Sequence, residues 1–181
     1  MLKSDLVVLQ KYSLEDAPKL FEAIKVSVDR VYPWLPWCHP DYTIEETEIW
    51  LKAKPQRWND GKEFGFSIRD LQNQIVGGCG IGITTQSWSG NLGYWLKTGA
   101  TGKGYATAAT KLLAEFGIKK LNLKRIEIVA SVENISSQKV AVRAGAYKEG
   151  ISRNRLLIHN KLHDAVIYSF IPDDFVKIGG Y

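Results

Sequence analysis

The stretch of residues 92–116, LGYWLKTGATGKGYATAATKLLAEF, decides the fold of this chain. It opens with an apolar, strand-like segment, passes through a turn that contains Gly99, Gly102 and Gly104, and then shows apolar residues at helical spacing. We therefore expect a strand that leads through a glycine-rich turn into a helix beginning at residues 102–105. Backbone amides at a helix start have no intrahelical partner and the helix dipole favours negative charge there, so this turn predicts an anion site.

Two common phosphate-binding motifs do not fit this turn. The P-loop spacing, GxxxxGK followed by Ser or Thr, is missing, and Gly99, Gly102 and Gly104 do not form the GxGxxG of a dinucleotide fold. Glycines still suit such a site, because a backbone without Cβ atoms lets a phosphate approach closely. Taken alone, the turn is equally compatible with a tight strand-to-helix connection that binds nothing.

Length and composition predict a single globular domain over residues 1–181. Apolar residues make up 45% of the chain and charged residues 24%. The net charge of +5 suits an anionic ligand, but no long run of Lys and Arg indicates direct nucleic-acid binding. The N-terminus shows no signal-peptide pattern and no apolar run nears about 18 residues, so we expect a cytoplasmic protein without a membrane segment.

The two cysteines do not suggest a disulfide framework or a metal site. Cys38 and Cys79 are far apart in sequence and neither lies in a CxxC motif. Cys38 and His39 are adjacent, but no further ligands follow at metal spacing, so we expect no metal. The sequence leaves the oligomeric state open, a homo-oligomer included.

Hydrophobic periodicity along the rest of the chain predicts a mixed α/β (α+β) domain. The expected order is β-α-α-β-β-β-α-β-α-β-β, with about four helices flanking a mostly antiparallel sheet of about seven strands. The expected strands cover residues 5–11, 63–69, 74–84, 90–96, 124–131, 147–157 and 163–171. The expected helices cover residues 14–28, 44–58, the segment after the glycine turn, and 134–144.

Local signals mark the ends of these helices. Residues 13–16 and 43–46 each form a capping box, and Gly145 is expected as a left-handed cap. The first helix is expected to turn Leu14 and Val28 inward together with the apolar residues between them. The second is expected to turn Trp50 inward and to be irregular at Pro55.

Residues 31–40 contain three prolines, which rule out regular structure and predict a loop. The loop carries Tyr32, Trp34 and Trp37. Clustered aromatic side chains on a loop fit either a wall of a substrate site or a hydrophobic plug that folds onto the core. These residues alone leave both interpretations open.

Residues 101–106, TGKGYA, resemble the pyrophosphate loop of the GNAT N-acetyltransferases, whose pattern is Q/R-x-x-G-x-G/A. Gly104 and Ala106 fill the small-residue positions, and Thr101 stands where Gln or Arg is usual. Residues 134–145 resemble a second GNAT element, N-x-x-S-x-x-V-A-x-x-x-G, one expected strand later. Two matched elements in the correct order extend the resemblance over essentially the whole chain.

Within that family the chain is most similar to the ribosomal-protein N-terminal acetyltransferases. The similarity lies in the WLPW of residues 34–37, the LGYWL of residues 92–96 and the GKGYAT of residues 102–107. It implies acetyl-CoA as co-substrate and a protein acceptor, with Trp34 and Trp37 as substrate-binding residues and Ser137 as the catalytic residue beside the thioester sulfur. The implied acetyl-CoA contacts are Tyr94, Trp95 and Leu96 for pantetheine, Thr101, Gly102, Lys103, Gly104, Tyr105, Ala106 and Thr107 for pyrophosphate, and Asn134 for the pantetheine arm.

The acceptor and the general base remain open. An α-amine has a pKa near 8, against about 10.4 for lysine, which favours a protein N-terminus, such as that of a ribosomal protein. The alternatives are a small amine (a polyamine, an aminoglycoside or an amino acid) and a catalytically weak acyl-CoA-binding or ribosome-associated module. Some relatives place a glutamate where this sequence reads RNRL at residues 153–156, so the base is a water chain, Glu127, His163 or Asp164.

Overall fold

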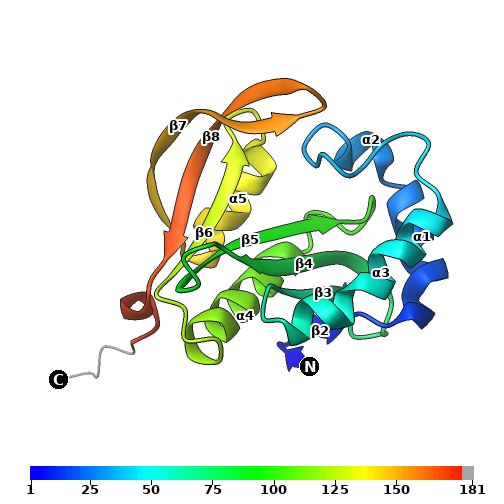
Figure 1. Ribbon diagram of the computed structural model, residues 1–181, viewed down its shortest axis with the longest axis horizontal. Helices are drawn as coiled ribbons and strands as arrows, with labels where there is room; N and C mark the ends of the chain where they lie inside the picture. The colour runs from blue at the N-terminus through cyan, green and yellow to red at the C-terminus, as the bar shows by residue number, and fades with distance from the viewer. Residues whose placement is uncertain (177–181) are drawn as a thin grey trace.

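The computed structural model describes residues 1–176, and the last five residues of the predicted domain lie outside it. Within residues 1–176 the chain forms eight strands in one sheet and five α-helices (Figure 1). In chain order these elements are β1 Leu2–Lys3, β2 Val8–Lys11, α1 Ala17–Lys25, α2 Val28–Val31, α3 Ile44–Asn59, β3 Glu63–Arg69, β4 Ile75–Ile83, β5 Ser89–Leu96, α4 Tyr105–Lys119, β6 Arg125–Ser131, α5 Ile135–Ala144, β7 Tyr147–Ile158 and β8 Lys161–Phe170. Short 3₁₀ turns precede α1 and follow β8.

The sheet confirms the predicted mixed, mostly antiparallel topology. Its strand order is β1-β2-β3-β4-β5-β6-β8-β7, and every neighbouring pair is antiparallel except β5 and β6. The α4 crossover between β5 and β6 makes this parallel pairing feasible, because parallel strands need a long connection. The parallel pair lies in the middle of the sheet, and α4 begins after the glycine turn that follows β5.

Two apolar clusters lie on the two faces of the sheet. One packs α4 and α5 against strands β2 to β6 and β8, and the other packs α1 and α3 near the start of β4. Tyr94 joins the first cluster and Trp95 the second. Since successive strand residues point to opposite faces, β5 lies between the α4–α5 layer and the α1–α3 layer.

Glycines on β4 allow β5 and its aromatic side chains to lie close. A Cβ atom on Gly77 would overlap the carbonyl oxygen of Trp95, and one on Gly78 would overlap the Tyr12 hydroxyl and lie 2.7 Å from the Trp95 indole nitrogen. The unusual glycine content of this strand thus follows from the close approach of its neighbours.

Both capping boxes and the left-handed cap are confirmed. Ser13 and Thr43 exchange hydrogen bonds with the residues three positions later, and Gly145 has a φ of +94° at the end of α5. The side chain of Asn134 caps the start of α5 by accepting a hydrogen bond from the Ser137 amide at 3.0 Å.

Three local predictions about the first third of the chain are wrong. The strand predicted over residues 5–11 begins only at Val8, because the Ser4 hydroxyl accepts the Val7 amide at 3.2 Å and closes a turn that separates β2 from the short strand β1. The first helix stops at Lys25, before a second short helix begins at Val28. Leu14 lies in the 3₁₀ turn and is exposed.

The second helix also differs from its prediction. α3 continues through Pro55 to Asn59. Trp50 is 38% exposed, whereas the side chain of Lys54 is buried and lies over the Trp50 ring with its ammonium 3.8 Å from the ring centroid. The aliphatic part of Lys54 packs on the inward face of α3, and its ammonium forms a salt bridge with Glu63. No helix within residues 1–176 has both the length and the apolarity to span a membrane.

Candidate active-site cleft

Strands β5 and β6 pair only at their starts, and their backbones separate beyond that point. This separation of the two strands is called the cleft. Residues 89–91 of β5 pair with residues 125–127 of β6, after which the strands diverge (Figure 1). Along residues 92–96 the edge of β5 that faces β6 pairs with no strand of the described chain. An unpaired strand edge offers backbone donors and acceptors to an extended ligand with amide groups.

The glycine turn lies at the end of this open edge. Gly99, Gly102 and Gly104 all have φ between +80° and +84°, a region that residues with a Cβ atom rarely adopt. Within residues 1–176, the backbone amides of residues 101–107 donate no hydrogen bond that closes a turn or caps the helix. Among the described residues, this leaves seven consecutive amides of the turn and the start of α4 available to an anion, as the sequence leads us to expect.

A hollow of about 570 Å³ lies beside the turn, between it, α1 and the start of β4. Lys97 and Lys103 line the hollow from the turn, and Lys19 lines it from α1. Glu22 and Asp70 also line it, so the positive charge is concentrated on the glycine-turn side. The amides offer hydrogen bonds to an anion. The positive charges of the lysines attract an anion over a longer distance.

Tyr94 and Ser137, which lie 43 residues apart, meet across the cleft. The Tyr94 hydroxyl donates to the Ser137 carbonyl oxygen at 2.9 Å and lies 3.1 Å from the Ser137 Oγ. Burial raises the pKa of Tyr94 to about 12, an effect that the Ser137 hydrogen bond opposes. Ser137 is held further by its amide, which donates to Asn134. These contacts fix the hydroxyl of Ser137 at the β5 side of the first turn of α5.

The aromatic loop reaches the other face of β5. Trp37 is 41% exposed and lies edge-on to Trp95, with ring centroids 6.0 Å apart, and edge-on to Tyr42 at 5.9 Å. Trp34 is half-buried and makes no ring contact with the described aromatic residues. The structure therefore brings the ring of Trp37 against β5 at Trp95.

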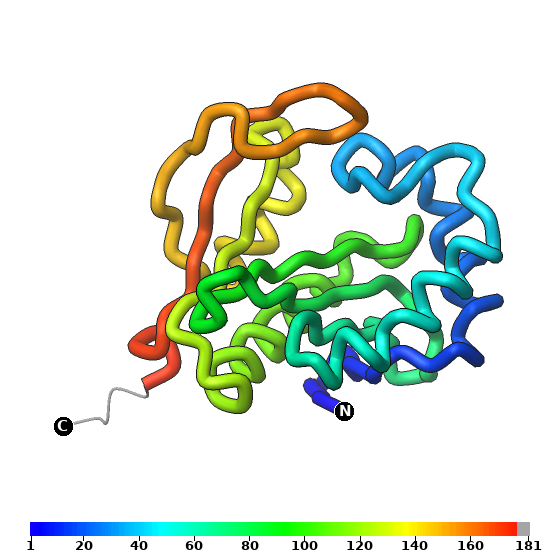
Figure 2. Tube along the Cα trace, in the orientation of Figure 1, coloured from blue at the N-terminus to red at the C-terminus, as the bar shows by residue number. Residues whose placement is uncertain are grey.

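One contact links the aromatic loop to the turn between β7 and β8. The Tyr32 and His159 rings are stacked at 4.0 Å, and His159 Nε2 is 2.9 Å from the Tyr32 carbonyl oxygen. Figure 2 shows the loop before α3 approaching the β7–β8 turn. Nothing in the sequence indicates this contact, because the two residues are 127 positions apart.

The three side chains that are candidates for the general base each interact with another group of the protein. Glu127 accepts hydrogen bonds from Arg125 at 2.9 and 3.1 Å. Asp164 accepts the Asn154 amide at 2.8 Å, and His163 faces Glu133 at 3.7 Å. None of the three has a hydrogen bond to Ser137 among the described residues.

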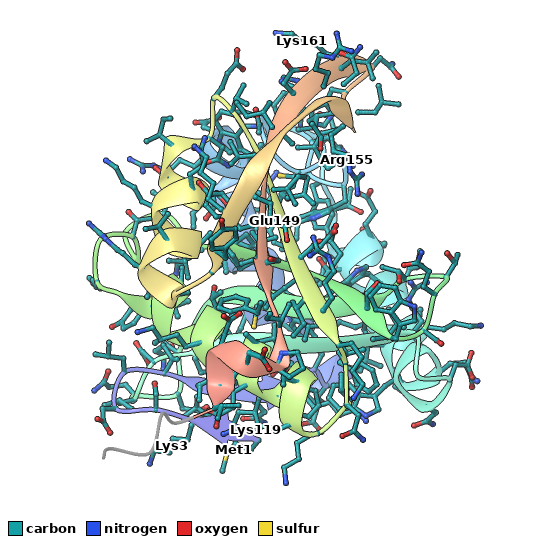
Figure 3. The ribbon with its side chains drawn as sticks, turned by 90° about the vertical axis from the view of Figure 1, so that its left-hand side faces the viewer. Met1, Lys3, Lys119, Glu149, Arg155 and Lys161 are labelled. Atoms are coloured by element: carbon teal, nitrogen blue, oxygen red, sulfur yellow. The ribbon has the colours of Figure 1, made fainter. Side chains whose placement is uncertain are left out.

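A further carboxylate on β7, Glu149, is held as an anion. Figure 3 labels it on β7, where it lies near the start of the strand, with Arg155 and Lys161 toward the end of the β7–β8 hairpin. Hydrogen bonds from Arg125 lower the pKa of Glu149 to about 2, and the Ser169 hydroxyl contributes. A carboxylate with so low a pKa is a weak base at neutral pH.

Known proteins match both the sequence and this architecture. The sequence profile of the acetyltransferase (GNAT) domain matches residues 7–147. YdaF of Bacillus subtilis, provisionally named a ribosomal N-acetyltransferase, is 38% identical over 84 residues. That match covers 46% of each protein, so it spans less than half of the relative's length.

Two solved structures share the fold over nearly the full chain. The ribosomal-protein-S5-alanine acetyltransferase of Vibrio fischeri superposes with a TM-score of 0.85 at 24% identity, covering 98% of this chain and 100% of that one. RimL, a ribosomal L7/L12 α-N-protein acetyltransferase in complex with coenzyme A, superposes with a TM-score of 0.86 at 22% identity, covering 94% and 97%.

Proposed function

Because the chain belongs to the acetyltransferase (GNAT) family, we propose that it transfers the acetyl group of acetyl-CoA to the N-terminal α-amine of a protein, with a ribosomal protein as the first candidate. The observation that carries the proposal is the run of free amides at residues 101–107 next to the open edge of β5. Similarity to YdaF and the shared fold with ribosomal-protein acetyltransferases support the choice of acceptor.

The cleft offers complementary groups for each part of acetyl-CoA. The backbone of Tyr94, Trp95 and Leu96 would pair with the two pantetheine amides as an added strand does. The amides of residues 102–107 would bind the pyrophosphate, and Lys103 supplies a positive charge where Thr101 replaces the usual Gln or Arg. Asn134 uses its side-chain oxygen as a helix cap, which leaves its amide nitrogen free to donate to pantetheine.

The reaction joins the amine nitrogen to the acetyl carbon and breaks the carbon–sulfur bond. The amine loses a proton through water, and the tetrahedral oxyanion accepts a hydrogen bond from a backbone amide near Leu96. The departing thiolate accepts a hydrogen bond from the Ser137 hydroxyl and takes its proton from solvent. Direct attack in a ternary complex requires no covalent intermediate on the protein.

Ligand-dependent melting tests the acetyl-CoA site. At a hundredfold excess over Kd, acetyl-CoA or CoA should stabilise the protein by about 2.7 kcal/mol, which raises Tm by roughly 5–10 °C for a domain of this size. Gly102→Ala should lose most of this shift, because its φ of +80° is needed to aim the loop amides.

Gly61→Ala is the matched control for that variant. Gly61 has a φ of +67° after α3, and neither glycine has an atom within 4 Å of an added Cβ. Both substitutions should therefore lower Tm of the free protein by a similar few degrees, at about 1 kcal/mol each. Absence of a ligand shift in the wild-type protein would refute the acetyl-CoA site.

The nature of the acceptor is tested with two peptides that differ in their only amine. One carries a free N-terminal α-amine and no lysine, and the other is blocked at its N-terminus and carries one lysine. At pH 7 the α-amine is about 200-fold richer in the neutral form, so thiol release should be about 100-fold faster with the first peptide. Equal rates, or faster release with spermidine, would reject the α-amine and favour a small amine.

A further inference from the structure

We propose that the side chain of Tyr94 is a positioning residue that orients the Ser137 hydroxyl toward the sulfur of the bound thioester. This inference rests on the proposed function, and it assigns a role to the Tyr94 side chain in addition to its backbone. Tyr94 reaches Ser137 from β5, across the part of the cleft where β5 and β6 do not pair.

The number of protons on the two hydroxyls determines which of them donates in the absence of ligand. A tyrosine hydroxyl has one proton, and here that proton is directed to the Ser137 carbonyl oxygen at 2.9 Å. At 3.1 Å the Ser137 hydroxyl then serves as the donor to the Tyr94 oxygen. The serine proton is therefore aimed at the Tyr94 oxygen, on the β5 side of α5.

Rotation of these two hydroxyl groups about their C–O bonds would allow Ser137 to donate a hydrogen bond to a departing thiolate. When negative charge develops on sulfur, the Ser137 proton can turn from Tyr94 to the sulfur, and the Tyr94 proton can turn from the carbonyl to Ser137 Oγ. Both hydroxyls stay neutral, so the thiolate leaves with a charge-assisted hydrogen bond and takes its proton from solvent. The high pKa of Tyr94, about 12, keeps its proton in place throughout the neutral range.

Fixing the serine hydroxyl also removes competing rotamers. A serine side chain has three staggered positions, and contact with Tyr94 selects one of them while the helix cap at Asn134 fixes the backbone. Loss of the Tyr94 hydroxyl should leave the fold intact, because a phenylalanine ring keeps the apolar contacts of Tyr94 with the α4–α5 cluster.

The first test is a double-mutant cycle on turnover. Tyr94→Phe should lower kcat about tenfold, the effect of one hydrogen bond, with the Kd of CoA changed less than twofold. On the Ser137→Ala background the same substitution should have no effect, because its action passes through Ser137. Equal tenfold losses on both backgrounds, or a matching loss of CoA affinity, would overturn the proposal. Tyr168→Phe is the control, since this buried tyrosine has no hydrogen bond to Ser137 among the described residues.

The second test needs no acceptor and no turnover. The thiol of bound CoA is titrated by its thiolate absorbance in the wild type, Tyr94→Phe, Ser137→Ala and the double variant. The wild type should hold the thiol pKa about one unit lower than Tyr94→Phe does, and the double variant should equal Ser137→Ala. Identical titrations in wild type and Tyr94→Phe, with CoA bound, would overturn the positioning role alone. Failure of the proposed function would instead appear as no thiol release with any amine while this titration still differed.

Discussion

Replacing Ser137 with alanine is expected to lower kcat about 100-fold and to leave CoA binding unchanged. In the proposed mechanism the hydroxyl stabilises the departing thiolate, and loss of a group that assists the transition state in this way typically costs this much. The proposed binding contacts come from other atoms, namely the amides of residues 101–107 and the backbone of β5. The measurement is thiol release with a saturating peptide acceptor, together with CoA titration of the same variant.

Ser136→Ala is the matched control for this prediction. Ser136 occupies the same turn of α5, is exposed and makes no side-chain hydrogen bond among the described residues. It should retain the wild-type kcat. If Ser137→Ala acetylates as fast as the wild type, the catalytic role of Ser137 is wrong. If the wild type binds CoA but releases no thiol with any amine, the chain is an acyl-CoA-binding module.

Replacing Gly77 with alanine is expected to lower Tm by roughly 6–12 °C. An added Cβ would overlap the carbonyl oxygen of Trp95, and it would lie 3.0 Å from the Leu96 Cα. Because both neighbours are backbone atoms, relief requires that β5 move away from β4. Overpacking of this kind costs about 3 kcal/mol, and a domain of this length loses about 2–4 °C for each kcal/mol.

Gly82→Ala on the same strand separates the clash from a general loss of strand glycines. Its Cβ would have no atom within 4 Å, so its Tm should change by less than about 2 °C. The displacement of β5 in Gly77→Ala should also weaken CoA binding, because the open edge of residues 92–96 belongs to the displaced strand. A Gly77→Ala protein that melts like the wild type would show that β5 adapts without strain.

The predictions that hold are those with a local cause. The glycine turn, the Asn134 cap and the Gly145 cap were predictable because single residue types meet single backbone requirements within a few positions. The order of strands and helices followed from periodicity in the same way. The open edge of β5 was expected only through the resemblance to the GNAT family.

The predictions that fail, and the contacts that were missed, have distant causes. The first helix ends early, at Lys25, and is followed by Ser27, whose hydroxyl donates to the Ala23 carbonyl at 2.6 Å and accepts the Thr98 amide at 2.9 Å. Thr98 is 71 residues away, so the hydrophobic period that continues to Val28 gave no sign of the break. The contact between Tyr94 and Ser137 has the same character, since each residue looks ordinary in its own segment.

The divergence of β5 from β6 also affects how readily the protein can aggregate through a strand edge. An unpaired strand edge is a template on which other chains can add and aggregate, and proteins usually protect such edges with charge, proline or a bulge. On β5 the unpaired edge lies inside the sheet, with β6 beyond it, and the Tyr32–His159 contact joins the segments on either side. A strand of another molecule would have to enter between two strands of the same sheet. The edge is thereby open to a slender ligand and shielded from self-association.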